Sequence, residues 1–295
     1  MKKQDAFSLI ELCVEIAIPE IDILGGEPLL VPWLKEFILE STGSGITVNL
    51  STNGASPELI DKYINIDTDF LNVGFSLLGL SEKHNHLTGS YNFSRAVEGI
   101  KMMISAGRNP IVKSVLMREN VNEIRALVYY LSELGVKRYY LLHEDIIGRN
   151  PDDLFSFPEY YEFYSTLKSE MKDITNIGSV AASGFCSGDV LHIPPHPGRC
   201  DAGVKKMAIM PDGSVFPCNL FFGMKEFKLG NIFRDSPEQI WMNPLLDIFR
   251  KSERNRCNTN QCKHFSSCRG GCPAHIYYFY GSFDKIDPRC EIKRV

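Results

Sequence analysis

Seven of the nine cysteines lie in the last third of this 295-residue chain, and their spacing is the strongest constraint that the sequence places on its fold. Twelve residues separate the first of them from Gly213, and the second follows after four more. A run of the form C-x4-C-x5-C-x3-C comes next, and one further cysteine stands after a longer gap. The seven are Cys200, Cys218, Cys257, Cys262, Cys268, Cys272 and Cys290.

Disulfides, zinc and iron–sulfur clusters are the three explanations for these thiols. Disulfides need an oxidising compartment, and the opening MKKQDAFSLIELCVEI contains no apolar signal stretch or small-residue cleavage site. Structural zinc prefers close pairs such as C-x2-C, which do not occur here. The x5 and x3 gaps, with Gly270 and Gly271 before Cys272, favour a backbone wrapped around a larger inorganic core. We therefore predict iron–sulfur ligation.

Two four-iron clusters require eight thiolates, so that seven cysteines leave one cluster short of a ligand. Cys186 either fills that position or is an unligated thiol. Cys13 lies in an apolar helical stretch, and we expect it in a hydrophobic core.

The composition excludes several classes of protein. Hydrophobic residues make up 44% of the chain, as in a globular protein with a sizeable core. The net charge of −4 gives no sign of the basic surface that binds nucleic acid. No apolar run approaches the roughly 18 residues that a membrane helix needs. The absence of a signal stretch and the reduced thiols predict a cytoplasmic protein with no membrane or nucleic-acid partner.

Apolar strands and amphipathic helices alternate along the first part of the chain, which predicts a parallel α/β sheet or barrel. After about residue 180 this pattern gives way to Gly, Pro and Cys with short strands, so we place one domain at 1–180 and a second at 181–295. The expected strands are 20–24, 46–51, 71–77, 111–117 and 137–142, and the expected helices are 5–17, 29–40, 57–66, 93–106, 121–134 and 158–172. In the second domain we expect strands at 207–210 and 214–216, a turn at 211–213, and helical pieces near 237–252.

Ligands bind beyond the carboxyl ends of parallel strands, where two segments carry suitable groups. Gly25-Gly26-Glu27-Pro28 follows the first expected strand and Ser51-Thr52-Asn53-Gly54 follows the second. Adjacent glycines let a backbone approach a ligand, and Glu27 could accept hydrogen bonds from an amine. Ser51, Thr52 and Asn53 offer hydroxyls and an amide. A tight turn between strand and helix is the simpler explanation of either segment alone.

GGEP after one strand, STNG after the next and a cysteine-rich tail together resemble the radical S-adenosylmethionine (radical SAM) enzymes that carry a SPASM domain. The resemblance spans nearly the whole chain, and its one irregular spacing is the x4 between Cys257 and Cys262, where x2 is usual. It implies a partial (β/α) barrel followed by a small cysteine-rich α+β SPASM domain. It also implies that Gly25, Gly26, Glu27 and Pro28 hold the amino group of S-adenosylmethionine, and that Ser51, Thr52 and Asn53 help to position its ribose and methionine parts.

The same resemblance implies two auxiliary 4Fe–4S clusters. One would be held by Cys257, Cys262, Cys268 and Cys290. The other would be held by Cys200, Cys218 and Cys272, with its fourth position open or filled by Cys186.

One expected element is absent from the printed sequence. Members of the family begin with a first barrel strand and a C-x3-C-x2-C loop, which binds the cluster that cleaves S-adenosylmethionine. Only Cys13 precedes the GGEP turn here. We expect a truncated sequence, with loss of the radical step as the alternative, and a sheet with its first strand missing and an edge exposed. These 295 residues alone are expected to be inactive in radical generation.

The implied activity is hydrogen abstraction from a peptide or protein side chain, with ferredoxin or flavodoxin as electron donor. The alternatives are modification of a tetrapyrrole or another small molecule, and a non-catalytic cluster-bearing subunit. Asn219 stands where sulfatase-maturing members carry an aspartate, which argues against that activity because an amide is no general base.

Other side chains are expected to be structural. His84 and His86 read as surface residues, and His264 and His275 either pack near the clusters or tune them. We expect the aromatic side chains of residues 277–280 to cover the core between the clusters.

Overall fold

The computed structural model describes residues 1–66, 68–180, 200–250, 257 and 270–290. They form two compact units. The first contains residues 3–142 and 164–178, and the second contains the described residues among 1–2, 143–163 and 179–295. The predicted roles of Cys186, Cys262, Cys268 and His264 fall outside the described residues. The predicted domain boundary at about 180 stays a prediction.

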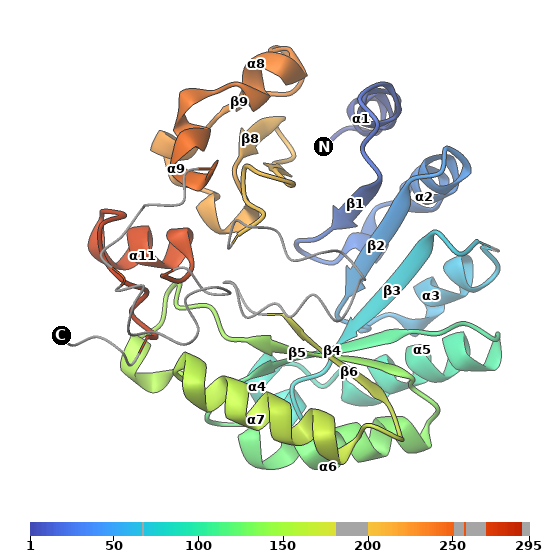
Figure 1. Ribbon diagram of the computed structural model, residues 1–295. Coiled ribbons are helices and arrows are strands. Elements are labelled where there is room, and N and C mark those ends of the chain that lie inside the picture. Colours follow the sequence, from blue (N-terminus) through green and yellow to red (C-terminus); the bar gives the residue numbers. More distant parts are fainter. Residues whose placement is uncertain (67, 181–199, 251–256, 258–269, 291–295) are drawn as a thin grey trace. The chain divides into compact units, whose positions relative to one another are not determined.

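A six-stranded sheet is the centre of the first unit, and its strand order follows the chain (Figure 1). The strands that pair between β1 and β4 run parallel, which confirms the expected α/β class. β1 lies at one edge of the sheet and β6, which the sequence did not predict, at the other. The strands are β1 (Glu20–Ile23), β2 (Thr47–Thr52), β3 (Leu71–Ser76), β4 (Ile111–Leu116), β5 (Arg138–His143) and β6 (Asn176–Val180).

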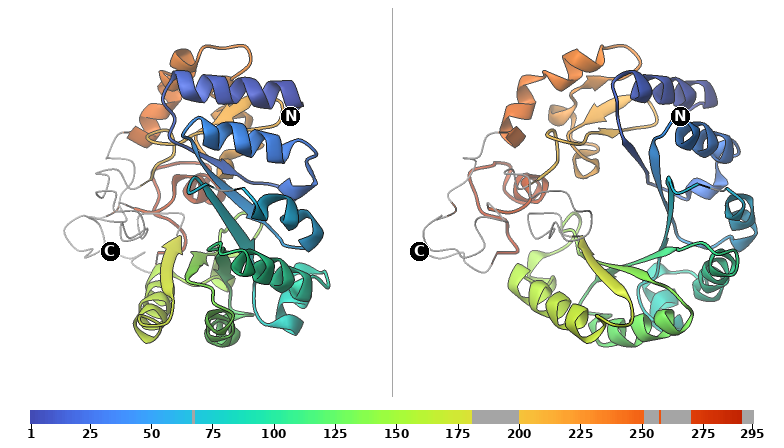
Figure 2. Two further views of the ribbon diagram at one scale, coloured as in Figure 1. Left: turned by 90° about the vertical axis from the view of Figure 1, so that its right-hand side faces the viewer. Right: turned by 45° about the vertical axis from the view of Figure 1, so that its right-hand side comes forward.

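Helices connect the strands and lie along one side of the sheet, as the views in Figure 2 show. The predicted helix at 29–40 is instead a 3-10 turn, Pro28–Leu30, followed by α2, because Pro32 stands between them and cannot continue a helix. The short helix α4 was also not predicted. The helices are α1 (Lys3–Glu15), α2 (Leu34–Gly43), α3 (Pro57–Ile64), α4 (Ser81–Thr88), α5 (Phe93–Ser105), α6 (Val121–Glu133) and α7 (Phe157–Glu170).

The two faces of the sheet differ in polarity. In β2, Val48 and Leu50 are buried, whereas the alternating Asn49 is only half-buried. Asn49 donates to Oδ1 of Asp22 on β1 at 2.8 Å and accepts from Nδ2 of Asn72 on β3 at 2.9 Å. Asn72 in turn accepts from Nη1 of Arg138 on β5 at 3.1 Å. We call Asp22, Asn49, Asn72 and Arg138 the polar belt; it crosses the face opposite the apolar one.

The second unit contains a three-stranded antiparallel sheet made from β7 (Ala208–Ile209), β8 (Ser214–Phe216) and β9 (Gly230–Asn231). The predicted hairpin turn joins β7 to β8. Asp212 fixes it by accepting from the backbone and hydroxyl of Ser214, both at 2.9 Å. Gly213 has φ +83°, and a Cβ there would lie 2.3 Å from the Phe233 ring. Only glycine therefore suits this position.

Short helices complete the second unit, and the expected helical pieces near 237–252 are present as far as residue 250. Ser236 and Gln239 form a capping box at the start of α8. In the core, Phe221 packs edge to face on Phe249 and in a tilted arrangement on Phe227. The helices are α8 (Pro237–Trp241), α9 (Asp247–Arg250) and α11 (Pro273–Tyr280), with 3-10 turns at Pro151–Asp153, Asn219–Phe221, Lys225–Phe227 and Pro244–Leu246.

Within the described part of the chain, every helix is too short or too polar to cross a membrane.

Candidate functional site

The carboxylate of Glu27 connects the two predicted ligand-binding turns. Its Oε1 accepts from the backbone of Leu29 at 3.1 Å and from the hydroxyl of Thr52 at 2.8 Å. Its Oε2 accepts from the backbone of Asn53 at 2.9 Å. The GGEP segment after β1 and the STNG segment after β2 are therefore held together at one end of the sheet.

The two glycines before Glu27 leave open space. Gly25 and Gly26 have φ +88° and +50°, a region that favours glycine, and a Cβ added to either would meet nothing within 4 Å. Pro28 is buried and begins the 3-10 turn that Glu27 caps. A ligand can thus approach the backbone of the turn while Glu27 keeps it in place.

A buried histidine supports the second turn, which corrects the expectation that His84 is a surface residue. His84 is 1% exposed and stands on α4, which brings it under the turn. Its Nδ1 accepts from the backbone of Leu78 at 3.1 Å, so Nε2 carries the proton and donates to Oδ1 of Asn92 at 2.9 Å. Asn92 donates to the carbonyl of Asn53 at 3.3 Å. Burial lowers the pKa of His84.

Ser51, the first residue of the STNG segment, contacts a lysine that was not predicted from the sequence. Nζ of Lys113 on β4 donates to Oγ of Ser51 at 2.9 Å. The lysine crosses β3 above Gly74, where a Cβ would lie 2.7 Å from its Cε. Burial lowers the pKa of Lys113, and the charge of Asp22 opposes that shift. No motif marks this lysine, since its place depends on the register of three strands.

Three of the predicted cluster ligands gather in the core of the second unit. Cys218 and Cys272 are buried there, and Cys200 packs against the same cluster. Burial, and next the charge of Cys200, raises the pKa of Cys218 to about 11. Burial, again followed by Cys200, raises the pKa of Cys272. The three thiols are therefore close enough to influence each other's ionisation.

The cluster ligation of these thiols stays a prediction. Among the described residues, no three His, Cys, Asp or Glu side chains are placed to hold one metal ion. Thiols whose pKa burial raises stay protonated unless a metal replaces the proton. Cys257 and Cys290 are described and half-buried, but they are not part of this core cluster.

A buried ion pair stands beside Cys272. The Asp287 carboxylate accepts from the backbone N–H of Cys272 at 2.8 Å and from Nη2 of Arg289 at 3.0 Å. Arg289 also donates to the carbonyl of Glu144 at 2.9 Å. Although burial alone would raise it, the Arg289 charge and its hydrogen bonds lower the pKa of Asp287 to about 2.

Two histidines surround this pair. His143 donates from Nε2 to the carbonyl of Phe155 at 2.7 Å and stacks on Tyr160. Burial, followed by the Arg289 charge, lowers its pKa to about 3. Nε2 of His275 lies 2.9 Å from Oδ1 of Asp145, although neither ring nitrogen makes a well-aligned hydrogen bond within the described part of the chain. His275 is fully buried, and whether it packs or tunes a cluster stays a prediction.

The remaining expectations are met in part. Cys13 packs against the core formed by α1 and α2, and His86 is exposed. In the aromatic run, Tyr277 packs on Phe227, but residues 278–280 are exposed and do not cover a core. Asn219 is exposed after Cys218.

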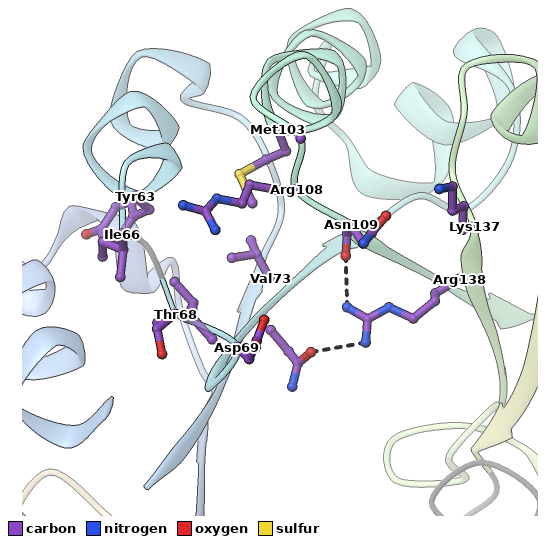
Figure 3. A pocket seen from close by; sticks show the side chains of 13 residues that line it. Tyr63, Ile66, Thr68, Asp69, Val73, Met103, Arg108, Asn109, Lys137 and Arg138 are labelled. Atoms are coloured by element: carbon purple, nitrogen blue, oxygen red, sulfur yellow. Dashed lines mark hydrogen bonds between the residues drawn. The ribbon is translucent and has the colours of Figure 1, made fainter. Parts of the chain in front are cut away.

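A cavity of about 470 Å³ lies at the opposite ends of the strands from Glu27 and contains none of the predicted site residues (Figure 3). The guanidinium of Arg138 donates to the carbonyl of Asn109 at 2.8 Å, as the dashed line between them in Figure 3 shows, and to Oδ1 of Asn72 at 3.1 Å. We assign it no role in the chemistry.

Two family models match the chain. The model of the radical SAM superfamily matches residues 1–138, and that of the SPASM iron–sulfur cluster-binding domain matches residues 200–272. Mycofactocin maturase MftC of Mycobacterium tuberculosis is 27% identical over 92% of this chain and 70% of its own length. The subtilosin biosynthesis protein AlbA of Bacillus subtilis is 29% identical over 85% of this chain and 56% of its own length.

The fold is also similar to solved structures. The crystal structure of SuiB from Streptococcus suis superposes with a TM-score of 0.76 at 18% identity, over 99% of this chain and 71% of SuiB. At this identity the likeness supports the fold.

Proposed function

This chain belongs to the radical SAM superfamily and carries a SPASM iron–sulfur domain, and from this premise we propose that it modifies a peptide or protein side chain by hydrogen abstraction. The observation that carries the proposal is that one chain contains both the Glu27-linked turns and the three cysteines that meet in the core of the second unit. The first is suited to S-adenosylmethionine and the second to an iron–sulfur cluster.

Gly25, Gly26 and Glu27 would hold the amino acid part of S-adenosylmethionine. The glycines present backbone atoms beside open space, and Glu27 provides the negative charge that an ammonium group needs. Ser51 and Asn53 would orient the ribose through their hydroxyl and amide groups. Bound S-adenosylmethionine would supply the radical that removes a hydrogen atom from the substrate once an iron–sulfur cluster reduces it, and the C-x3-C-x2-C loop that binds this cluster in the family is not among these 295 residues.

Cys200, Cys218 and Cys272 would hold one auxiliary 4Fe–4S cluster, and Cys257, Cys262, Cys268 and Cys290 would hold the other. Cys218 and Cys272 are buried and Cys200 is partly buried, which would limit the access of water to thiolate–iron bonds. The chain's part in the chemistry is then to keep these ligands in place and to give the substrate electron a route away from the site.

The names of the relatives favour a peptide as substrate. MftC is a maturase, AlbA makes a bacteriocin, and SuiB has been solved with a precursor peptide, SuiA. We extend this substrate class to the present chain, with ferredoxin or flavodoxin as electron donor and the cytoplasm as its location. A tetrapyrrole or other small molecule, and a purely structural cluster-binding role, are the alternatives.

The binding test uses anaerobically reconstituted protein. We expect about eight irons per chain, as two four-iron clusters require, and saturable binding of S-adenosylmethionine by calorimetry. Glu27→Gln should weaken that binding about tenfold or more while the iron content is unchanged. The matched control is Glu58→Gln, since Glu58 pairs with Arg95 at the surface. Stoichiometric zinc without iron, or equal binding by both variants, would contradict the proposal.

The substrate test is co-expression of the full-length protein with short peptides encoded beside its gene, followed by mass spectrometry. A mass change on one peptide residue that disappears in Glu27→Gln is the expected result. Unmodified peptides together with a modified tetrapyrrole would favour the small-molecule alternative.

A further inference from the structure

The Asp287–Arg289 pair is the most deeply buried pair of opposite charges in the described part of the chain. Both side chains are fully buried, and Nη2 of Arg289 lies 3.0 Å from Oδ2 of Asp287. Nε donates to the other carboxylate oxygen at 3.1 Å, so the contact is bidentate. Burying two charges is costly, and a hydrophobic pair of the same volume often stabilises a fold at least as well. A buried pair in this position therefore calls for an explanation other than stability.

The carboxylate half of the pair is bonded directly to a predicted cluster ligand. Oδ2 of Asp287 accepts the backbone N–H of Cys272 at 2.8 Å. Gly271, just before it, has φ +94°, and a Cβ there would lie 2.1 Å from Cβ of Asp287. Asp287 thus packs tightly on the backbone that presents the Cys272 sulfur.

The guanidinium half is held on all sides. It donates to the carbonyl of Glu144 at 2.9 Å, and it lies over the Phe157 ring at 4.7 Å from the centroid. The backbone N–H of Phe157 donates to the carbonyl of Arg289 at 3.2 Å. Arg289 therefore has little freedom to move its charge away from Asp287.

We propose that the Asp287–Arg289 pair sets the reduction potential of the auxiliary cluster that Cys272 ligates, with Asp287 positioning the ligand and Arg289 compensating the carboxylate charge. The inference rests on the proposed function, because it assumes that Cys272 binds iron. Reduction adds one electron to a cluster, so a nearby negative charge lowers its potential and a nearby positive charge raises it. Asp287 accepts the backbone N–H of Cys272 and Arg289 donates to Asp287, so charges of opposite sign lie next to this ligand.

Removing either charge alone must then shift the potential in opposite directions. Arg289→Gln leaves an uncompensated carboxylate and should lower the potential of one cluster. Asp287→Asn keeps an oxygen for the Cys272 amide, leaves an uncompensated guanidinium and should raise it. Arg289→Lys keeps the charge, and the double variant Asp287→Asn/Arg289→Gln removes both charges; each should stay close to the wild-type potential.

The experiment is an anaerobic redox titration followed by electron paramagnetic resonance on the reconstituted full chain. The shifted signal should be the one lost in Cys218→Ala. Arg95→Gln, which removes a cation from a surface pair, is the matched control and should leave the potential unchanged.

The outcomes are separable. Wild-type protein without clusters would contradict the proposed function. Clusters whose potential is unchanged in both single variants, or shifts in the same direction in both, would overturn the inference while the proposed function stands. Loss of the cluster from every variant, Arg289→Lys included, would also overturn it, because the pair would then serve assembly alone.

Discussion

The hydroxyl of Thr52 donates to the carboxylate of Glu27 at 2.8 Å, and this bond joins the ends of two neighbouring parallel strands. Thr52 is buried, and its oxygen also accepts the backbone N–H of Gly54 at 3.0 Å. Glu27, which would bind a ligand, therefore also connects the GGEP turn to the STNG turn.

Thr52→Val is expected to test this tie without changing the shape of the side chain. It removes the donor to Glu27 and the acceptor for Gly54, so we expect a loss of about 1–3 kcal/mol in the free energy of unfolding. Anaerobic urea unfolding measures it. The control is Thr47→Val on the same strand, where the side chain is only half-buried. Equal stabilities for the two variants would show that the tie contributes nothing.

Cys218→Ala and Cys13→Ala should separate a ligand from a core thiol. We expect Cys218→Ala to lose about four irons per chain, the content of one cluster. Cys13 packs in the α1–α2 core, where burial raises its pKa, so its replacement should cost stability and leave the iron content unchanged. Iron analysis and visible absorption check both. A full iron content in Cys218→Ala would remove this residue from the ligand set.

Stability should fall with acid because of His143. Burial lowers the folded-state pKa to about 3. An unfolded histidine titrates near 6.5, so between these values the unfolded chain binds a proton that the folded chain does not. The contribution of His143 to the free energy of unfolding is therefore fully present above about pH 6.5. As the pH falls below this value, the free energy of unfolding falls by up to about 1.4 kcal/mol per pH unit.

His143→Gln should therefore reduce the slope of the unfolding free energy against pH by up to about 1.4 kcal/mol per pH unit, the contribution of one proton. Urea unfolding from pH 7 to pH 4 measures the slope, and the exposed His86→Gln serves as the control. An unaltered slope in His143→Gln would place the imidazole in a more solvated environment than the structure shows.

Two glycines with nearly equal backbone angles should respond differently to alanine. Gly213 and Gly223 have φ +83° and +85°, so both variants strain the backbone by about 1 kcal/mol. Only at Gly213 does the new Cβ also meet the Phe233 ring, which adds about 1–3 kcal/mol. Thermal unfolding of the two variants compares them, and equal destabilisation would mean that Phe233 can move aside freely.

The regular part of the fold was predictable from the sequence because its signals are local. Apolar runs bounded by Gly, Asn and Pro located five strands of the sheet, and GGEP and STNG marked the ends of two of them. Residues 176–180 were missed because three of the five are Asn, Gly and Ser, which leaves only two apolar residues to indicate a strand. The division of 28–43 into two helical pieces was signalled by Pro32, but its effect on the boundary was underestimated.

The site was predictable only where a motif names its residues. Gly25, Gly26, Glu27 and Thr52 could be found because they lie at the carboxyl ends of two strands or just beyond them. Lys113 was not found, because it reaches Ser51 across an intervening strand and depends on a glycine at position 74. His84 was assigned to the surface because its sequence neighbours are polar. This polar sequence gave no sign of α4, the helix that places His84 beneath the STNG turn. Contacts over such separations are set by register and packing, which no local pattern records.

The polar belt on one face of the sheet has a consequence for how such a protein can change over evolutionary time. Its members are joined by side-chain hydrogen bonds and are partly buried or exposed, whereas Val48, Leu50, Val73 and Phe75 are buried on the face that packs against the helices. Exchanges in the belt would alter the shape and charge of this face with little disturbance of the apolar packing. The two faces of the sheet can therefore diverge separately.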